Sequence, residues 1–142
     1  MRLKRRTSYK AETFTESVIR EMTRRVIDKH GANGINLAQG YPDFPAPQEI
    51  KDAACRAIQE DINQYAITWG ARNFREAIAQ KTKKFLEADV DPETEITVCC
   101  GATEGMISAL MATLNPDDEV IIFSPFYENY GPDCILSGAQ PK

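Results

Sequence analysis

The sequence predicts an α/β fold with a mostly parallel sheet, and three observations in its second half support this prediction. An apolar, β-branched run, ITVCC at 96–100, stops at a glycine, and a helical pattern follows over 103–114. A second apolar run, EVIIF at 119–123, comes after the turn NPDD. This run lacks polar alternation, as is typical of parallel strands covered on both faces. A strand, a helix and a second strand in this order form the smallest parallel unit.

The first half of the chain is predicted to begin with a helix over 13–29. Thr13 followed by Glu16 is a capping-box pattern. Apolar residues then recur at helical spacing, and they are Phe14, Val18, Ile19, Met22 and Val26. The sequence GANG at 31–34 ends this helix, and the proline-rich stretch 35–47 is expected to be a loop.

Two further helices are expected before the first strand. One begins at Pro47, which suits a first helical turn, and continues to residue 61. The stretch NQYAITWG at 63–70 is a loop, and a helix over 73–88 follows it. We expect Arg72 and Arg75 to belong to the solvated face of that helix rather than to an anion site.

The last stretch, SPFYENYGPDCILSG at 124–138, is expected to be a loop that leads into another short helix. Two parallel strands cannot form a sheet covered on both faces, and three or more are normally needed for a stable sheet. We therefore expect the chain to be the N-terminal part of a longer protein. The isolated chain is expected to aggregate through the uncovered apolar edge of its last strand.

Composition indicates a soluble globular protein, with 42% hydrophobic and 27% charged residues and a net charge of −4. No run approaches the roughly 20 apolar residues of a membrane-spanning helix, and no apolar signal segment follows the basic start. Residues 1–30 hold nine Lys and Arg against four Asp and Glu. The arm MRLKRR at 1–6 could contact nucleic acid or an anionic membrane. Because it is short and has no interleaved aromatic residues, we prefer a solvated or subunit-contacting arm, with neither nucleic acid nor membrane as a partner.

The cysteines and the single histidine, His30, indicate neither zinc nor disulfide chemistry. The four cysteines are Cys55, Cys99, Cys100 and Cys134. They show no zinc-ligand spacing, and adjacent cysteines on a strand point to opposite faces and cannot easily pair with each other. We expect reduced, mostly buried thiols, a cytoplasmic location and no metal site.

The turn at Gly101 is the candidate binding feature of the sequence. The first amides of a helix are unpaired and carry partial positive charge, so a strand-to-helix corner suits a phosphate group. Gly101 allows close backbone approach, Ala102 adds no bulk, and Thr103 offers a hydroxyl and an amide. The stretch is neither a P-loop nor a GxGxxG motif, and a plain βα turn that needs glycine is the alternative.

Four stretches in order are QGYPDFPAP, NQYAITWGARNFREAI, ITVCCGATEGM and DEVIIFSPFYENYGP. They resemble the N-terminal portion of class I/II, fold-type-I aminotransferases that depend on pyridoxal phosphate, most closely the kynurenine, methionine and aspartate branch. The resemblance runs from about Thr13 to the last residue. It implies a three-layer α/β/α fold with a mostly parallel sheet, here incomplete. Residues 1–49 would be an arm, a helix and a substrate-mouth loop on the small-domain side. Residues 50–142 would begin the large cofactor-binding domain.

The resemblance also implies cofactor-binding roles for five residues. The turn Gly101, Ala102 and Thr103 would hold the phosphate of pyridoxal 5'-phosphate. Phe126 would stack on the pyridine ring, for which a flat apolar face is suited. Tyr65 would reach across a homodimer to the phosphate in the partner subunit, with its phenol as the donor. The alternatives are a core aromatic for Phe126 and a packing tyrosine for Tyr65.

Substrate contacts are implied for three more residues. Gly40 would lie against the substrate carboxylate, whereas its alternative is a turn glycine. Tyr41 and Trp69 would shape the side-chain pocket, which leans towards bulky or neutral amino donors over aspartate. Tyr130, one helical turn beyond Phe126, is expected to pack rather than to touch the cofactor.

The implied activity is transfer of an amino group from an amino acid to a 2-oxo acid by the full-length protein. No catalytic residue is expected in these 142 residues, because none of the lysines matches the pattern of the Schiff-base lysine; the chain alone would be inactive. The alternatives are a carbon–sulfur β-lyase or an aminocyclopropane-carboxylate synthase of the same fold, and a non-catalytic phosphate-binding or assembly fragment.

Overall fold

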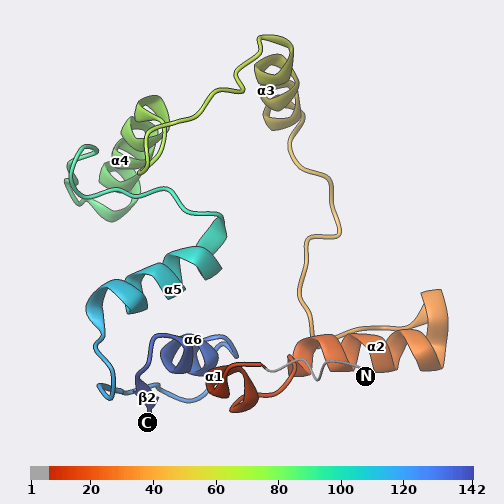
Figure 1. The fold of residues 1–142 in the computed structure, drawn as a ribbon. Coiled ribbons are helices and arrows are strands. Elements are labelled where there is room, and N and C mark those ends of the chain that lie inside the picture. The colour runs from red at the N-terminus through yellow and green to blue at the C-terminus, as the bar shows by residue number, and fades with distance from the viewer. Residues whose placement is uncertain (1–6) are drawn as a thin grey trace, which may run out of the picture. The chain divides into compact units, whose positions relative to one another are not determined.

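The computed structural model describes residues 7–142 (Figure 1). The basic arm predicted at 1–6 lies outside the described residues. The described residues divide into two compact units. The first comprises the residues up to Gly40 together with Gly101–Lys142, and the second comprises Tyr41–Cys100. The predicted division into residues 1–49 and 50–142 stays a prediction.

Most of the described secondary structure is helical, as Figure 1 shows. The helices are α1 Tyr9–Glu12, α2 Val18–His30, the 3₁₀ helix η1 Gly31–Asn33, α3 Gln48–Gln59, α4 Arg72–Leu86, α5 Gly101–Thr113 and α6 Tyr130–Leu136. The predicted helices corresponding to α3, α4 and α5 are confirmed to within about two residues at each end, and the short helix expected within 124–138 is confirmed as α6. The loops predicted at 35–47 and 63–70 are also confirmed.

The predicted start of the first long helix is wrong. Thr13 does not begin a helix but ends α1, because its amide and its hydroxyl both donate to the Lys10 carbonyl, at 3.3 and 2.7 Å. Helix α2 begins five residues later, at Val18, after the N-cap residue Ser17. The Ser17 hydroxyl accepts the Arg20 amide at 3.2 Å and so satisfies one of the unpaired first-turn donors.

The sheet has two short parallel strands, β1 Glu119–Val120 and β2 Gln140–Pro141. The parallel pairing is extended by the Ile122 amide, which donates to the Lys142 carbonyl at 3.0 Å. The predicted strand at 96–100 is wrong, because this stretch has no strand partner among the described residues. A strand exists only where a neighbouring strand accepts and donates its backbone bonds. The parallel β–α–β unit therefore occurs one element later than predicted, as β1, α6 and β2.

Helix α6 is the packing centre of the first unit. It contacts α5, α1 and β2 (Figure 1), and the buried apolar residues of the described chain, Cys134 and Ala139, lie in it and just after it. The Lys10 ammonium of α1 donates to the Leu136 carbonyl at 2.8 Å. The Tyr130 ring packs against that of Tyr127: the two rings meet edge to face, with centroids 5.9 Å apart.

Two predictions about side-chain burial are wrong. Cys134 is buried, but Cys55 and Cys100 are exposed and Cys99 is half-buried, since 96–100 does not form the covered strand that would enclose its thiols. Arg75 is fully buried rather than solvated. The chain beyond α4 folds back over it, and Arg72 alone remains on the exposed face. No helix in residues 7–142 is both long enough and apolar enough to cross a membrane.

Candidate functional site

The beginning of α5 is a corner with little side-chain bulk. Gly101 has φ +78°, a left-handed conformation that favours glycine, and a Cβ built on it would meet nothing within 4 Å. Helix α5 then continues for 13 residues, so its first amides have no acceptor within the helix. Ala102 and Thr103 supply two of these amides. The corner therefore presents backbone donors in an open space, as an anion site requires.

An open cleft of about 880 Å³ lies within the first unit. Its wall is made by the chain from Thr13 to the first turn of α2, by residues 38–40, by Thr103, and by the stretch that leads into α6. Two predicted site residues, Gly40 and Thr103, thus line one cleft although they are far apart in the sequence. The other wall residues include Tyr127, Asn129 and Pro132.

The charged side chains of the cleft wall are Glu16, Arg20 and Glu128. Glu16 forms a salt bridge with Arg24, and the hydrogen bonds from this guanidinium are the main reason why the pKa of Glu16 is lowered. The carboxylate of Glu128 caps α2, because it accepts the Ser17 hydroxyl at 2.5 Å and the Val18 amide at 3.1 Å. Both carboxylates are thus engaged by the protein itself.

Sequence reasoning missed Ser17 and Glu128. Ser17 could have been found, because serine is a preferred N-cap residue and an apolar, helix-forming stretch follows it. Glu128 had no such signal. It accepts the hydroxyl of the N-cap residue and the first amide of α2, but it comes from a stretch more than one hundred residues away.

The remaining predicted site residues lie in two places. In the first unit, Phe126 is half-exposed and is the neighbour of Tyr127, which lines the cleft. Tyr41, Tyr65 and Trp69 belong to the second unit. Tyr65 is fully exposed on the loop between α3 and α4, and Trp69 lies at the end of the same loop with 43% of its surface exposed.

Solved structures with the same fold are aminotransferases of fold type I. The methionine aminotransferase YbdL of Escherichia coli matches with a TM-score of 0.86 and 35% identity, over 98% of this chain and 36% of that chain. The N-succinyldiaminopimelate aminotransferase of Mycobacterium tuberculosis matches with a TM-score of 0.86 and 34% identity, over 96% of this chain and 35% of that chain. The predicted fold class is therefore confirmed.

The chain belongs to the family described as aminotransferase class I and II, whose model matches residues 32–142. It is 42% identical to the methionine aminotransferase of Escherichia coli over 76% of this chain. It is 37% identical to the aspartate aminotransferase of Thermotoga maritima over 80%, and 31% identical to the mouse kynurenine–oxoglutarate transaminase 3 over 99%. The chain spans 28%, 30% and 30% of these three relatives. The family predicted from the four sequence stretches is confirmed.

Proposed function

We propose that the complete protein containing this chain is a pyridoxal-phosphate-dependent aminotransferase, which moves an amino group from an amino acid to a 2-oxo acid. The observation that carries the proposal is the family match over 32–142. The matched range includes the open α5 corner and Gly40. Gly40 and Thr103, the third residue of that corner, line the same cleft. A helix start that offers unpaired amides beside a cleft is chemically suited to a phosphate monoester.

In this proposal the chain anchors and orients the cofactor and the substrate. The amides at Gly101 and Ala102 and the amide and hydroxyl of Thr103 hold the phosphate, and Phe126 stacks on the ring. Gly40 lies against the substrate carboxylate. The absence of a side chain at Gly101, where a Cβ would enter empty space, supports close approach of the phosphate to the backbone. Bound pyridoxal phosphate supplies an electron sink for the amino-group transfer.

Three residues of the second unit have proposed roles of their own. The Tyr65 hydroxyl donates a hydrogen bond to the phosphate bound by the partner subunit of a homodimer. The full exposure of Tyr65 permits this contact. Tyr41 and Trp69 shape the pocket for the substrate side chain, and they favour a bulky or neutral amino donor over aspartate. We propose no proton-transferring residue among these 142 residues. A cytoplasmic location and a role in amino acid metabolism and biosynthesis complete the proposal.

The proposal is tested on the natural polypeptide that contains this chain. Pyridoxal phosphate is expected to produce a visible absorption band that shifts when an amino donor is added. Methionine, kynurenine, phenylalanine and aspartate should be compared, since relatives are named for methionine, kynurenine and aspartate. We expect the largest shift with a neutral or bulky donor. A protein that binds the cofactor but gives no shift with any donor contradicts the aminotransferase proposal.

The phosphate site has its own test. Thr103→Val keeps the side-chain shape and removes the hydroxyl, so the affinity for pyridoxal phosphate should fall by about tenfold, the effect of losing one hydrogen bond to a charged group. Thr113→Val is the matched control, because the Thr113 hydroxyl donates to the Ala109 carbonyl on the same helix. Equal affinities for the two variants would remove Thr103 from the site.

A further inference from the structure

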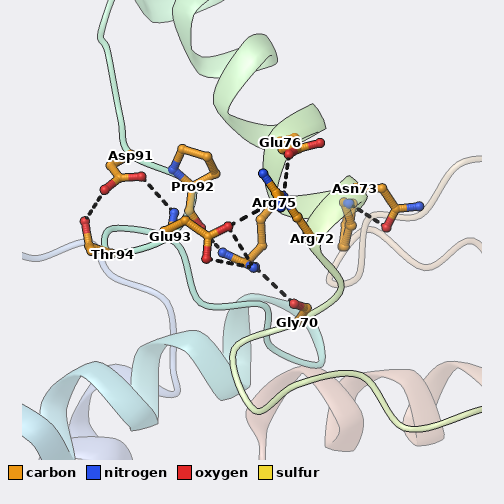
Figure 2. Close-up of polar contacts among 10 residues, drawn as sticks. Gly70, Arg72, Asn73, Arg75, Glu76, Asp91, Pro92, Glu93 and Thr94 are labelled. Atoms are coloured by element: carbon orange, nitrogen blue, oxygen red, sulfur yellow. Dashed lines mark hydrogen bonds and ion pairs between the residues drawn. The ribbon is translucent and has the colours of Figure 1, made fainter.

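Arg75 is the largest fully buried side chain in the part of the chain that the structure describes, with 0% of its surface exposed. Burying a guanidinium costs free energy unless partners surround it. Arg75 has partners in three directions. Its Nε donates to the Gly70 carbonyl at 3.0 Å, its Nη1 to the Pro92 carbonyl, and its Nη2 faces the Glu93 carboxylate at 3.4 Å (Figure 2). The side chain therefore ties the first turn of α4 to two other segments.

The first of these segments is the corner at Gly70, which ends the loop that carries Tyr65 and Trp69. Gly70 has φ +107°, and its amide donates to the Ile67 carbonyl at 2.8 Å. The Val98 amide donates to the Trp69 carbonyl at 3.0 Å. A Cβ on Gly70 would lie only 2.4 Å from a methyl carbon of Val98. Two neighbouring carbonyls thus hold the corner: that of Gly70 binds Arg75 of α4, and that of Trp69 binds the Val98 amide.

The second segment is a turn built by Asp91. Its carboxylate accepts the Glu93 amide at 2.9 Å and the Thr94 hydroxyl at 2.7 Å (Figure 2). These two bonds, the amide first, lower the pKa of Asp91. They also fix the turn in the conformation that presents the Pro92 carbonyl and the Glu93 carboxylate to Arg75. The segments on both sides of the guanidinium are therefore held by hydrogen bonds of their own.

We infer that Arg75 is a positioning residue that holds the Tyr65–Trp69 loop in place by clamping Gly70 against the Asp91–Thr94 turn. The inference rests on the proposed function, because Tyr65 and Trp69 are proposed to contact the cofactor phosphate and the substrate. A planar guanidinium can donate along several edges at once, whereas an ammonium on a flexible stem cannot reproduce this geometry. The clamp thus requires arginine itself, not only a positive charge.

The test uses Arg75→Met and Arg75→Lys in the natural polypeptide, with Arg72→Met as the matched control. Arg72 lies on the same helix turn but is exposed; its main partner is Glu76 at 2.8 Å, and its Nε lies 3.8 Å from Glu93 without a hydrogen bond to Gly70 or Pro92. We expect amide hydrogen exchange in peptides covering 63–70 and 95–100 to become at least about tenfold faster in both Arg75 variants, since the corner loses its clamp. Arg72→Met should leave this exchange unchanged. Unchanged exchange in the Arg75 variants overturns the clamp.

Gly70→Ala provides a second route if the Arg75 variants do not fold. It leaves the guanidinium in place but forces the corner away from Val98. It should therefore reproduce the faster exchange of the 63–70 peptide. Normal exchange in Gly70→Ala would overturn the claim that this corner determines the position of the loop.

The functional part of the inference is read from cofactor affinity. Titration with pyridoxal 5'-phosphate should show at least about fivefold weaker binding in Arg75→Met and Gly70→Ala than in Arg72→Met, because a displaced Tyr65 loses its bond to the phosphate. Faster exchange with equal affinity overturns the positioning role. Failure of the unsubstituted protein to bind the cofactor overturns the proposed function instead, so the two failures are distinguishable.

Discussion

At the scale of single residues, Asp133 is the buried acid of α6. It is 93% buried, and its Oδ2 has no hydrogen-bond partner among the described residues. Burial raises its pKa above the ordinary 3.8, since the charged form is disfavoured where water is excluded. Burial, and secondarily the charge of Asp133, also raises the pKa of the neighbouring Cys134 thiol. We therefore expect Cys134 to be protonated and unreactive near neutral pH.

Asp133→Asn is expected to stabilise the protein at neutral pH but not in acid. Because the folded-state pKa is raised, the folded protein keeps a proton that the unfolded chain has lost, so stability falls as pH rises from 3.8 through the folded pKa. Asparagine cannot ionise and therefore removes this loss, so Asp133→Asn should be the more stable protein at neutral pH. Denaturant unfolding of both proteins across this pH range measures it. Parallel pH profiles would contradict the expectation.

Residue burial was the least predictable property from sequence. Helical spacing places Arg72 and Arg75 near the start of one helix and offers no reason to bury either of them. Arg75 is buried because the chain folds back over it at Pro92 and Glu93, and no local sequence pattern predicts that contact. The small-residue corner at Gly101 was predictable, because glycine, alanine and threonine before a helical pattern have a local chemical meaning.

At the scale of elements, α2 depends on a cap from another part of the chain. Ser17 and Glu128 together satisfy donors at its first turn. We expect Ser17→Ala and Glu128→Ala each to destabilise the protein by about 1 kcal/mol, the usual cost of losing a helix cap.

The two substitutions are expected to be non-additive, because the Ser17 hydroxyl donates to the Glu128 carboxylate and also accepts the Arg20 amide, so both side chains belong to one network. A double-mutant cycle by denaturant unfolding measures the coupling, and exchange of the amides at 18–21 shows whether the first turn opens. Strict additivity would mean that the two side chains act independently.

Helices were predicted better than strands. Helices α3 and α4 were found from local periodicity, since helix hydrogen bonds join residues close in sequence. The strand at 96–100 was not, because strand formation depends on a partner that the local pattern cannot supply. The wrong start at Thr13 has a similar origin: threonine can cap a helix or end one, and the hydroxyl here bonds backward to Lys10.

At the scale of the whole molecule, apolar surface is poorly covered. Helix α5 is apolar on nearly all sides but has no buried residue. Beside it, an apolar groove of about 280 Å³ is lined by Met106, Leu110, Val120, Ile121, Ile122, Phe123, Tyr130 and Cys134. A helix that is apolar all round is normally enclosed by other elements.

We therefore expect the isolated 142-residue chain to self-associate. Ile121 and Phe123 are 74% and 84% exposed next to the open edge of β1, which can pair with another chain. Light scattering and sedimentation of the isolated chain test this, and Ile121→Lys should reduce association by placing a charge beside that edge. A soluble monomer with a cooperative thermal transition would show the expectation to be wrong.

The β1–α6–β2 unit also has a consequence for the order of events during synthesis. Its strand bonds, such as those from the Gln140 amide to Asp118 and from the Lys142 amide to Val120, join residues only about 22 positions apart. Closing so short a segment costs little chain entropy, so this unit can assemble as soon as it leaves the ribosome, before more distant partners meet.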